Sequence, residues 1–206
     1  MISFAFGIPA YRGQVSVGHI YQAVNLGALC AVARRDFSFT SIIDVDSCFV
    51  DFARNRLLYG AIGSGADWLL MMDSDVHHQV PGDLLSMLSL GHSQGAAVIA
   101  PPCKKRKSPS YMVERKAADG SLSVLDHPEF RGEVVPVDRI ATSCMAIRCG
   151  WIVKNWPDQP WFTTQHLPGA VPSVRGEDYS FCDGVRSRGG TILADGRFEP
   201  THVGAS

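Results

Sequence analysis

The run Trp68-Leu69-Leu70-Met71-Met72-Asp73-Ser74-Asp75-Val76-His77-His78 is the most informative part of the sequence, because an apolar stretch ends abruptly in charge. Five consecutive apolar residues indicate a strand that is buried on both faces, as in a parallel sheet. The two aspartates that follow repel each other unless a positive group lies between them. A strand period of two predicts that their side chains point to the same side. We therefore expect a divalent cation at the end of this strand.

Strand-like and helix-like segments alternate on both sides of this run. Gly and Pro punctuate them, and Pro81 is placed to begin a helix. This alternation predicts an α/β fold with a mixed, mostly parallel sheet and helices on both faces. We expect one domain over residues 1–206. Residues 103–137 are predicted to form an inserted loop or β-ribbon, and residues 151–172 a second long loop.

Composition excludes several classes of protein. The chain has 206 residues, 46% of them hydrophobic, and a formal net charge of −1, so no global attraction to nucleic acid or membrane is expected. Its six cysteines form no C-x-x-C pair, which argues against a zinc knuckle and favours buried thiols. The N-terminus is a poor signal peptide, and no apolar run is long enough to span a bilayer. We expect a cytoplasmic protein without a membrane span.

Three further features change the interpretation of the aspartate pair, which alone is equally well explained as a solvated turn. Glu177 and Asp178 form a second acidic pair at a predicted helix start, where a helix cap is the plain alternative. His202 follows the last predicted strand, which can return it to the crevice; an exposed tail is the alternative. Arg54 begins the preceding helix and is placed to reach a phosphate, unless it belongs to a solvated face.

The order of these features resembles the GT-A glycosyltransferases, which use nucleotide sugars, and most of all their small bacterial and phage members related to the large inverting family. The pieces that carry the resemblance are GIPAYR, ARNRLLYGAIGSGADWLLMMDSDVHHQVPGDLLSML, TSCMAI, GEDYSFCDGVRSRGG and the final THVG. They cover most of the chain outside residues 103–137 and 151–172. The resemblance implies a GT-A, Rossmann-like sheet. One departure is Ser-Cys in TSCMAI, where many relatives carry a Gly-aromatic pair.

The resemblance also implies a role for each matching residue. Asp75 would bind the metal directly, Asp73 would contact the ribose or a metal-bound water, and His202 would add a ligand. Imidazole beside carboxylates favours Mn²⁺ over Mg²⁺. Asp178 would be the catalytic base, and Glu177 would either contact the acceptor or support the base from behind. The implied donor-binding residues are Pro9, Tyr11, Arg12, Asp44, Arg54, Asp73 and Ser74. The implied acceptor residues are Thr142, Ser143 and Trp161.

The predicted activity is transfer of a sugar from a nucleoside-diphosphate sugar, with UDP favoured, to an acceptor hydroxyl, with inversion favoured over retention. The acceptor stays open between a saccharide, a lipid-linked sugar, a protein and a hydroxymethylated DNA base. The basic run at 104–107 is either a solvated loop or a contact for a polyanion such as nucleic acid. The alternatives are a nucleotidyltransferase of related fold and an inactive nucleotide-sugar-binding module.

Overall fold

The structure is a computed structural model. It describes residues 1–10, 17–33, 35–105, 108–167 and 173–202, and the side chains of residues 41–44 are left out of the description. Two of the predicted donor residues, Tyr11 and Arg12, therefore lie outside the described residues, as does the side chain of Asp44.

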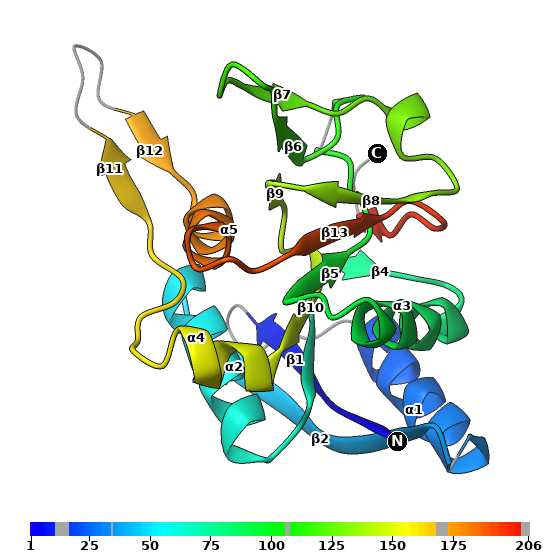
Figure 1. Cartoon of the computed structure of the whole chain (residues 1–206). Helices are drawn as coiled ribbons and strands as arrows, with labels where there is room; N and C mark the ends of the chain where they lie inside the picture. The colour runs from blue at the N-terminus through cyan, green and yellow to red at the C-terminus, as the bar shows by residue number, and fades with distance from the viewer. Residues whose placement is uncertain (11–16, 34, 106–107, 168–172, 203–206) are drawn as a thin grey trace.

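A seven-stranded mixed sheet forms the centre of the molecule (Figure 1). Its strands, in spatial order, are β2 (Phe37–Asp46), β1 (Ile2–Ala10), β3 (Trp68–Met72), β10 (Cys144–Arg148), β5 (Val98–Ala100), β13 (Ile192–Asp195) and β8 (Val134–Val137). Strands β1, β2 and β3 are parallel to one another, and β5 is parallel to β13. Strand β10 is antiparallel to both β3 and β5, and β8 is antiparallel to β13. The predicted α/β fold with a mixed sheet is thus confirmed, but the sheet is not mostly parallel, because three of its six strand pairings are antiparallel.

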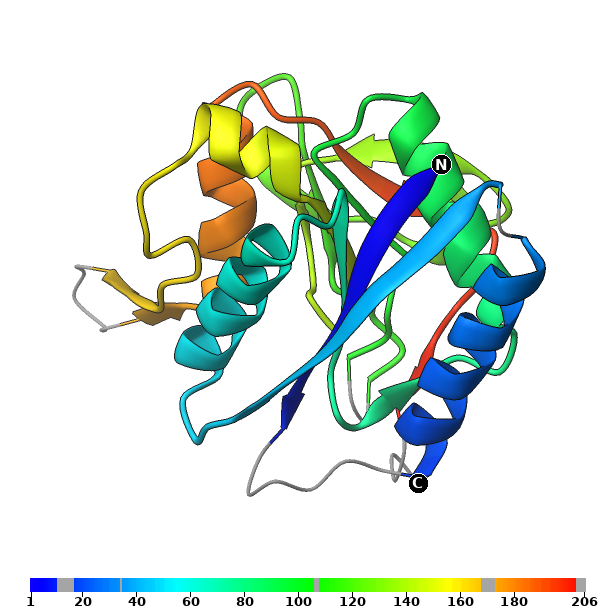
Figure 2. The ribbon, with the colours of Figure 1, turned by 90° about the horizontal axis from the view of Figure 1, so that it is seen from below.

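Helices cover both faces of this sheet (Figure 2). They are α1 (Val17–Val32), α2 (Val50–Gly63), α3 (Pro81–Ser93), α4 (Cys149–Asn155) and α5 (Glu177–Ser187). The side chains of β3 pack on both faces of the sheet, because successive strand residues point in opposite directions. Leu69 and Met71 pack into the core beneath α2, α4 and α5. Trp68, Leu70 and Met72 pack into the core beneath α1 and α3.

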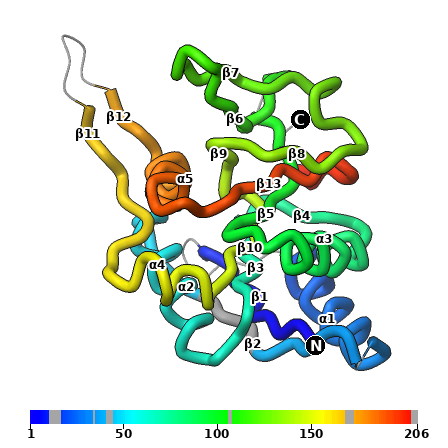
Figure 3. The backbone as a smooth tube through the Cα atoms, in the orientation of Figure 1, coloured from blue at the N-terminus to red at the C-terminus, as the bar shows by residue number. Residues whose placement is uncertain are grey.

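Three small β units surround the main sheet. Residues 103–137, expected as a loop or ribbon, contain two strands of a three-stranded antiparallel sheet and the edge strand β8. The three-stranded sheet comprises β7 (Leu122–Val124), β6 (Val113–Lys116) and β9 (Arg139–Ile140), and a 3₁₀ turn spans His127–Glu129. A hairpin of β11 (Gln165–Leu167) and β12 (Ser173–Arg175) extends away from the sheet (Figure 3). The third unit pairs β4 (Val76–His77) with β14 (Thr201–His202).

The central strand is shorter than predicted. Strand β3 ends at Met72, which is the last residue that pairs with β10, opposite Cys144. The next residues turn: the backbone N–H of Asp73 donates to the carbonyl of Ser143 at 2.9 Å, and that of Val76 donates to the carbonyl of Asp73 at 2.9 Å. Strand periodicity therefore does not place Asp73 and Asp75, which follow the strand in a turn, although both side chains line the same cavities.

Candidate functional site

The predicted acidic and basic residues meet where β3 ends, at the carboxyl edge of the parallel strands. Open α/β sheets bind ligands outside this edge. The Asp73–Asp75 turn leaves β3 there, α2 begins beside it with Arg54, and α5 begins there with Glu177 and Asp178. Residues far apart in the sequence thus line one site.

Arg54 holds two of these carboxylates together. Its Nη2 donates to both oxygens of Asp73, at 2.8 and 3.0 Å, and its Nη1 donates to Glu177. Burial lowers the pKa of this guanidinium, but the charges of Asp73 and Glu177 outweigh it and raise the pKa, so Arg54 stays protonated. Each oxygen of Asp73 therefore accepts one hydrogen bond from an arginine, and the positive group beside Asp73 is Arg54, where a metal ion was predicted.

Asp75 faces His202. The Oδ2 of Asp75 lies 3.7 Å from Nδ1 of His202. Pairing of β14 with β4 brings the histidine there, since His202 is opposite Val76 in the register. The expectation that the last strand returns His202 to the crevice is thus confirmed. Within the described ranges, no three His, Cys, Asp or Glu side chains are grouped to hold a metal.

This pair nevertheless suits a divalent cation of a particular kind. The 3.7 Å separation is shorter than twice a metal–ligand bond of about 2.1 Å, so both atoms can reach one ion. A carboxylate and an imidazole accept Mn²⁺ as well as Mg²⁺. Cations held by so few protein ligands take their remaining ligands from water and from substrate phosphates. The residues therefore fit a cation that binds together with a phosphate ligand.

Asp178 has the properties of a proton acceptor. Burial, followed by the neighbouring carboxylate of Glu177, raises the pKa of Asp178 above its ordinary value of 3.8. Its Oδ1 accepts a hydrogen bond from the backbone N–H of Tyr179 at 2.7 Å. This hydrogen bond favours the ionised form, but desolvation outweighs it. A raised pKa brings a carboxylate closer to the range in which general bases work near neutral pH.

Two cavities adjoin at this cluster and share Arg54, Asp73 and Asp75. The first has a volume of about 280 Å³ and lies between the end of β1 and the start of α2. Its lining includes Pro9, Ala10, Ser47, Cys48 and Ser74. The second has a volume of about 350 Å³. Its lining includes Lys105, Met112, Thr142, Ser143, Glu177, Asp178 and His202.

The described residues thus support most of the predicted grouping, with one exception. Pro9 and Ser74 lie in the first cavity, and Thr142 and Ser143 lie in the second. Trp161 lines neither of them. Its side chain is 3% exposed, packs into the core, and donates from Nε1 to the carbonyl of Trp156 at 2.8 Å. The predicted acceptor role of Trp161 is therefore wrong, because its ring holds the loop after α4 against the core.

Buried polar residues that the sequence did not reveal support the Asp73–Asp75 turn. His19, fully buried on α1, donates from Nε2 to the carbonyl of Asp73 at 2.9 Å. Cys103 places its Sγ 3.5 Å from Nε2 of His202. Burial raises the pKa of that thiol to about 11, so it is neutral at pH 7. Neither residue forms a motif, and a His inside a helical pattern gives no signal of a contact so distant in sequence.

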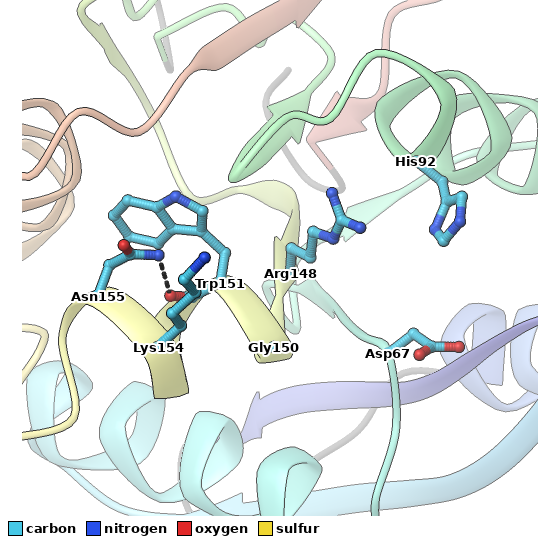
Figure 4. Close-up of a pocket in the computed structure, with 7 residues that line it drawn as sticks. All are labelled: Asp67, His92, Arg148, Gly150, Trp151, Lys154 and Asn155. Atoms are coloured by element: carbon cyan, nitrogen blue, oxygen red, sulfur yellow. Dashed lines mark hydrogen bonds between the residues drawn. The ribbon is translucent and has the colours of Figure 1, made fainter.

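A larger cavity of about 460 Å³ lies at the other edge of the sheet (Figure 4). Arg148 and Asp67 line it, together with residues of α3 and α4. Arg148 pairs with Trp68, at the end of β3 opposite to Met72, so this cavity is remote from the acidic cluster. Size alone does not identify a site, and the cluster at the carboxyl edge has the chemistry that this cavity lacks.

Comparison with known proteins identifies a fold and no family. No protein-family model matches the chain, and no curated protein matches it. Among solved structures, the chain is similar to one titled "Crystal Structure of A197 from STIV", with a TM-score of 0.61 and 17% identity over 98% of this chain and 85% of that chain. At this identity the likeness shows a related α/β fold alone. Of the helices that the structure describes, none has the length and apolar character needed to cross a membrane.

Proposed function

We propose that this protein is a metal-dependent glycosyltransferase of the GT-A type, which transfers a sugar from a nucleoside-diphosphate sugar to an acceptor hydroxyl with inversion. The observation that carries the proposal is the junction of two cavities at Arg54, Asp73 and Asp75. A reaction between two substrates needs two adjoining sites with the reacting groups where they meet. A site for hydrolysis of one small molecule would need only one of them.

The first cavity suits the nucleotide. It lies at the end of β1 and the start of α2, and Asp73 and Ser74 offer oxygen atoms to a ribose. Arg54 fixes the carboxylate of Asp73 by the two hydrogen bonds that it donates, so the ribose would meet a rigid acceptor.

The diphosphate would lie between the cavities, beside Asp75 and His202. These two residues would hold the cation, and Mn²⁺ fits them better than Mg²⁺ because one ligand is an imidazole. When bound there, a divalent cation neutralises the charge that develops on the leaving diphosphate. Asp73 is tied to Arg54 and acts on the donor without binding the metal.

Asp178 would accept the proton from the acceptor hydroxyl in the second cavity. The hydroxyl oxygen forms its bond to the anomeric carbon as the bond from that carbon to the diphosphate breaks. Asp178 takes the proton of the hydroxyl, and the diphosphate leaves with the electron pair. The raised pKa of Asp178 suits this role. Glu177 is engaged by Arg54 and positions the start of α5, so we assign it no contact with the acceptor.

A panel of nucleoside-diphosphate sugars with Mn²⁺ tests the proposal, with two measurements on each sugar. The shift of the melting temperature reports donor binding, and release of free nucleoside diphosphate reports cleavage of the donor. Asp75→Ala should abolish the Mn²⁺-dependent shift while leaving the fold intact. Asp158→Ala, at an exposed carboxylate in the loop after α4, is the control and should behave as the wild type.

Three outcomes would contradict the proposal. Unchanged affinity and metal dependence of Asp75→Ala would remove the metal assignment. Binding of donor without release of nucleoside diphosphate, in the presence of a broad set of acceptors, would indicate a binding module. Formation of nucleoside triphosphate from a nucleotide sugar and pyrophosphate would indicate a nucleotidyltransferase.

A further inference from the structure

The side of helix α1 that faces solvent carries many apolar residues. Six outward residues form a continuous stripe along it: Val17, Ile20, Tyr21, Val24, Ala28 and Val32. We call this stripe the α1 outer face. Near the N-terminal end, Val17 is 82% exposed, Ile20 58%, Tyr21 68% and Val24 64%. The spacing of three and four residues places all six on one side of the helix.

The inner face of the same helix carries polar groups. His19 and Gln22 are buried there beside Leu26. His19 donates to the carbonyl of Asp73, and the side-chain carbonyl of Gln22 accepts from the backbone N–H of His78 at 3.4 Å. These contacts explain the polar residues inside, because they hold the turn that carries Asp75. They do not explain the apolar residues outside, whose side chains are mostly exposed.

Charge is also missing from this helix. The sequence of α1 contains no Asp, Glu, Lys or Arg over its 16 residues. A helix at the surface of a monomer normally carries charged residues on the side that faces water. Contiguous apolar patches beyond a few hundred Å² mark interaction sites in most soluble proteins. The α1 outer face has both properties of a surface that is covered in the working protein.

We propose that the α1 outer face binds a second copy of this chain, forming a two-fold symmetric dimer. Across a two-fold axis each residue near the axis meets its own counterpart, so any charge there meets a like charge. An uncharged helix avoids this repulsion completely. The stripe runs from Val17 to Val32, so its midpoint lies at Val24 and Asn25. Two antiparallel copies of α1 therefore bring Val24 of one chain against Val24 of the other.

The size of the α1 outer face limits how much surface this dimer can bury. A helix of 16 residues is about 24 Å long and about 10–12 Å wide, so half of its accessible surface amounts to about 500 Å² per copy. The pair would bury about 1,000 Å², which is near the lower limit for a specific interface. We therefore infer a reversible dimer whose population depends on protein concentration.

A lipid surface fits the α1 outer face less well. Helices that lie in a membrane interface are rich in Lys and Arg, which attract anionic lipids. Helix α1 has neither residue, and the formal net charge of the whole chain is −1. The same absence of charge that permits self-association thus removes the electrostatic part of membrane binding.

Sedimentation velocity of the full chain between about 1 and about 200 µM tests the proposal. The wild type should shift from monomer toward dimer over this range. Val24→Asp and Val24→Lys should each remain monomeric, with unchanged far-UV circular dichroism, because the introduced charges repel their own copies. An equimolar mixture of the two variants should recover dimer, since opposite charges then meet at the axis. Tyr59→Asp, at an exposed aromatic residue of α2, is the control and should dimerise as the wild type.

A wild type that stays monomeric at the highest concentration overturns the proposal. So does a dimer that persists in both Val24 variants, because the contact then lies elsewhere. Failure of the mixture to recover dimer would remove the contact of Val24 with its own counterpart, and with it the symmetric arrangement. Flotation of the wild type with neutral or anionic phospholipid vesicles, abolished by Val24→Asp, would assign the face to a membrane and also overturn the dimer.

Discussion

Arg54 Nη2 donates to both carboxylate oxygens of Asp73, at 2.8 and 3.0 Å, while Nη1 of the same side chain donates to Glu177. One buried guanidinium thus connects the end of β3, the start of α2 and the start of α5. Arg54 is 5% exposed, so these charges are largely removed from water. Their mutual pairing is what makes their burial tolerable, because an unpaired buried charge is strongly destabilising.

Replacing this arginine should therefore destabilise the fold. Arg54→Leu leaves the partly buried carboxylates of Asp73 and Glu177 beside each other without a counter-charge, which should cost up to the roughly 3–5 kcal/mol of a broken buried pair. Urea denaturation at pH 7 measures the change in the free energy of unfolding. Arg56→Leu, two residues away on the exposed side of α2, is the matched control and should change it by less than about 0.5 kcal/mol. Equal stability of the two variants would show that the network contributes little.

Loss of His202 should weaken metal binding while leaving some of it. His202→Ala removes the imidazole but keeps Asp75, so we expect Mn²⁺ affinity to fall by a factor of about ten or more. Titration calorimetry with Mn²⁺ and a bound nucleoside diphosphate measures this directly, and excess Mn²⁺ should restore part of the activity. His166→Ala, at an exposed histidine of β11, is the control. An inactive variant with normal Mn²⁺ affinity would contradict the ligand role.

Replacing the proposed base should separate catalysis from binding. Asp178→Asn keeps the hydrogen bond from Tyr179 but cannot accept a proton, so transfer should slow by a factor of about a hundred or more. Donor affinity and metal affinity should barely change, because Asp178 holds neither ligand. Single-turnover kinetics and donor titration on the same variant measure both quantities. Near-normal turnover would favour a retaining mechanism, and loss of donor binding would move Asp178 to the donor site.

The same residue sets a pH dependence with a definite sign. Burial raises the pKa of Asp178 above 3.8, so the folded protein keeps this carboxyl protonated to a higher pH than the unfolded chain does. Transfer should therefore decline as pH falls through this raised pKa, and the decline should begin at a higher pH than for an ordinary aspartate. The ionised carboxylate opposes folding at higher pH, and this cost disappears below its unfolded pKa. Asp178→Asn should consequently be at least as stable as the wild type at pH 7, as thermal unfolding would show.

Cysteine reactivity offers a test that does not depend on the proposed activity. All six cysteines are free; Cys48 is exposed and the other five are buried. Burial raises the pKa of Cys103 to about 11 and that of Cys149 to about 12, which suppresses the reactive thiolate. Ellman's reagent at pH 7.5 should modify one thiol rapidly in the folded protein, and none in Cys48→Ser. Rapid modification of several thiols would contradict the buried placement.

Local patterns in the sequence predicted the main sheet well. The apolar run of β3 and the Pro81 start of α3 are both signals that depend on nearby residues only. The extent of β3 was less predictable. Its end at Met72 depends on where β10 stops pairing, and β10 lies more than seventy positions away in the chain. A strand boundary fixed by a distant partner leaves no local signal.

The site shows the same division. The acidic pairs and His202 were recognisable as unusual charges at strand and helix ends. The partner of Asp73 was not recognisable, because nothing in the order of residues shows whether a metal ion or the guanidinium of Arg54 lies beside Asp73. Trp161 was misassigned because the local sequence of an aromatic residue in a Pro-rich loop is the same whether its ring faces a ligand or the core. The hydrogen bond that it makes to Trp156 belongs to tertiary structure alone.

The two-stranded pairing of β14 with β4 has a consequence for the time course of biosynthesis. A nascent chain that has emerged through Pro200 already contains every strand of the main sheet, and it can bury most of its core. Its Asp75 still lacks His202, because that residue arrives with the next few peptide bonds and is held by pairing with Val76. Any cation that binds this pair would then be captured only after residue 202 has emerged and β14 has paired with β4.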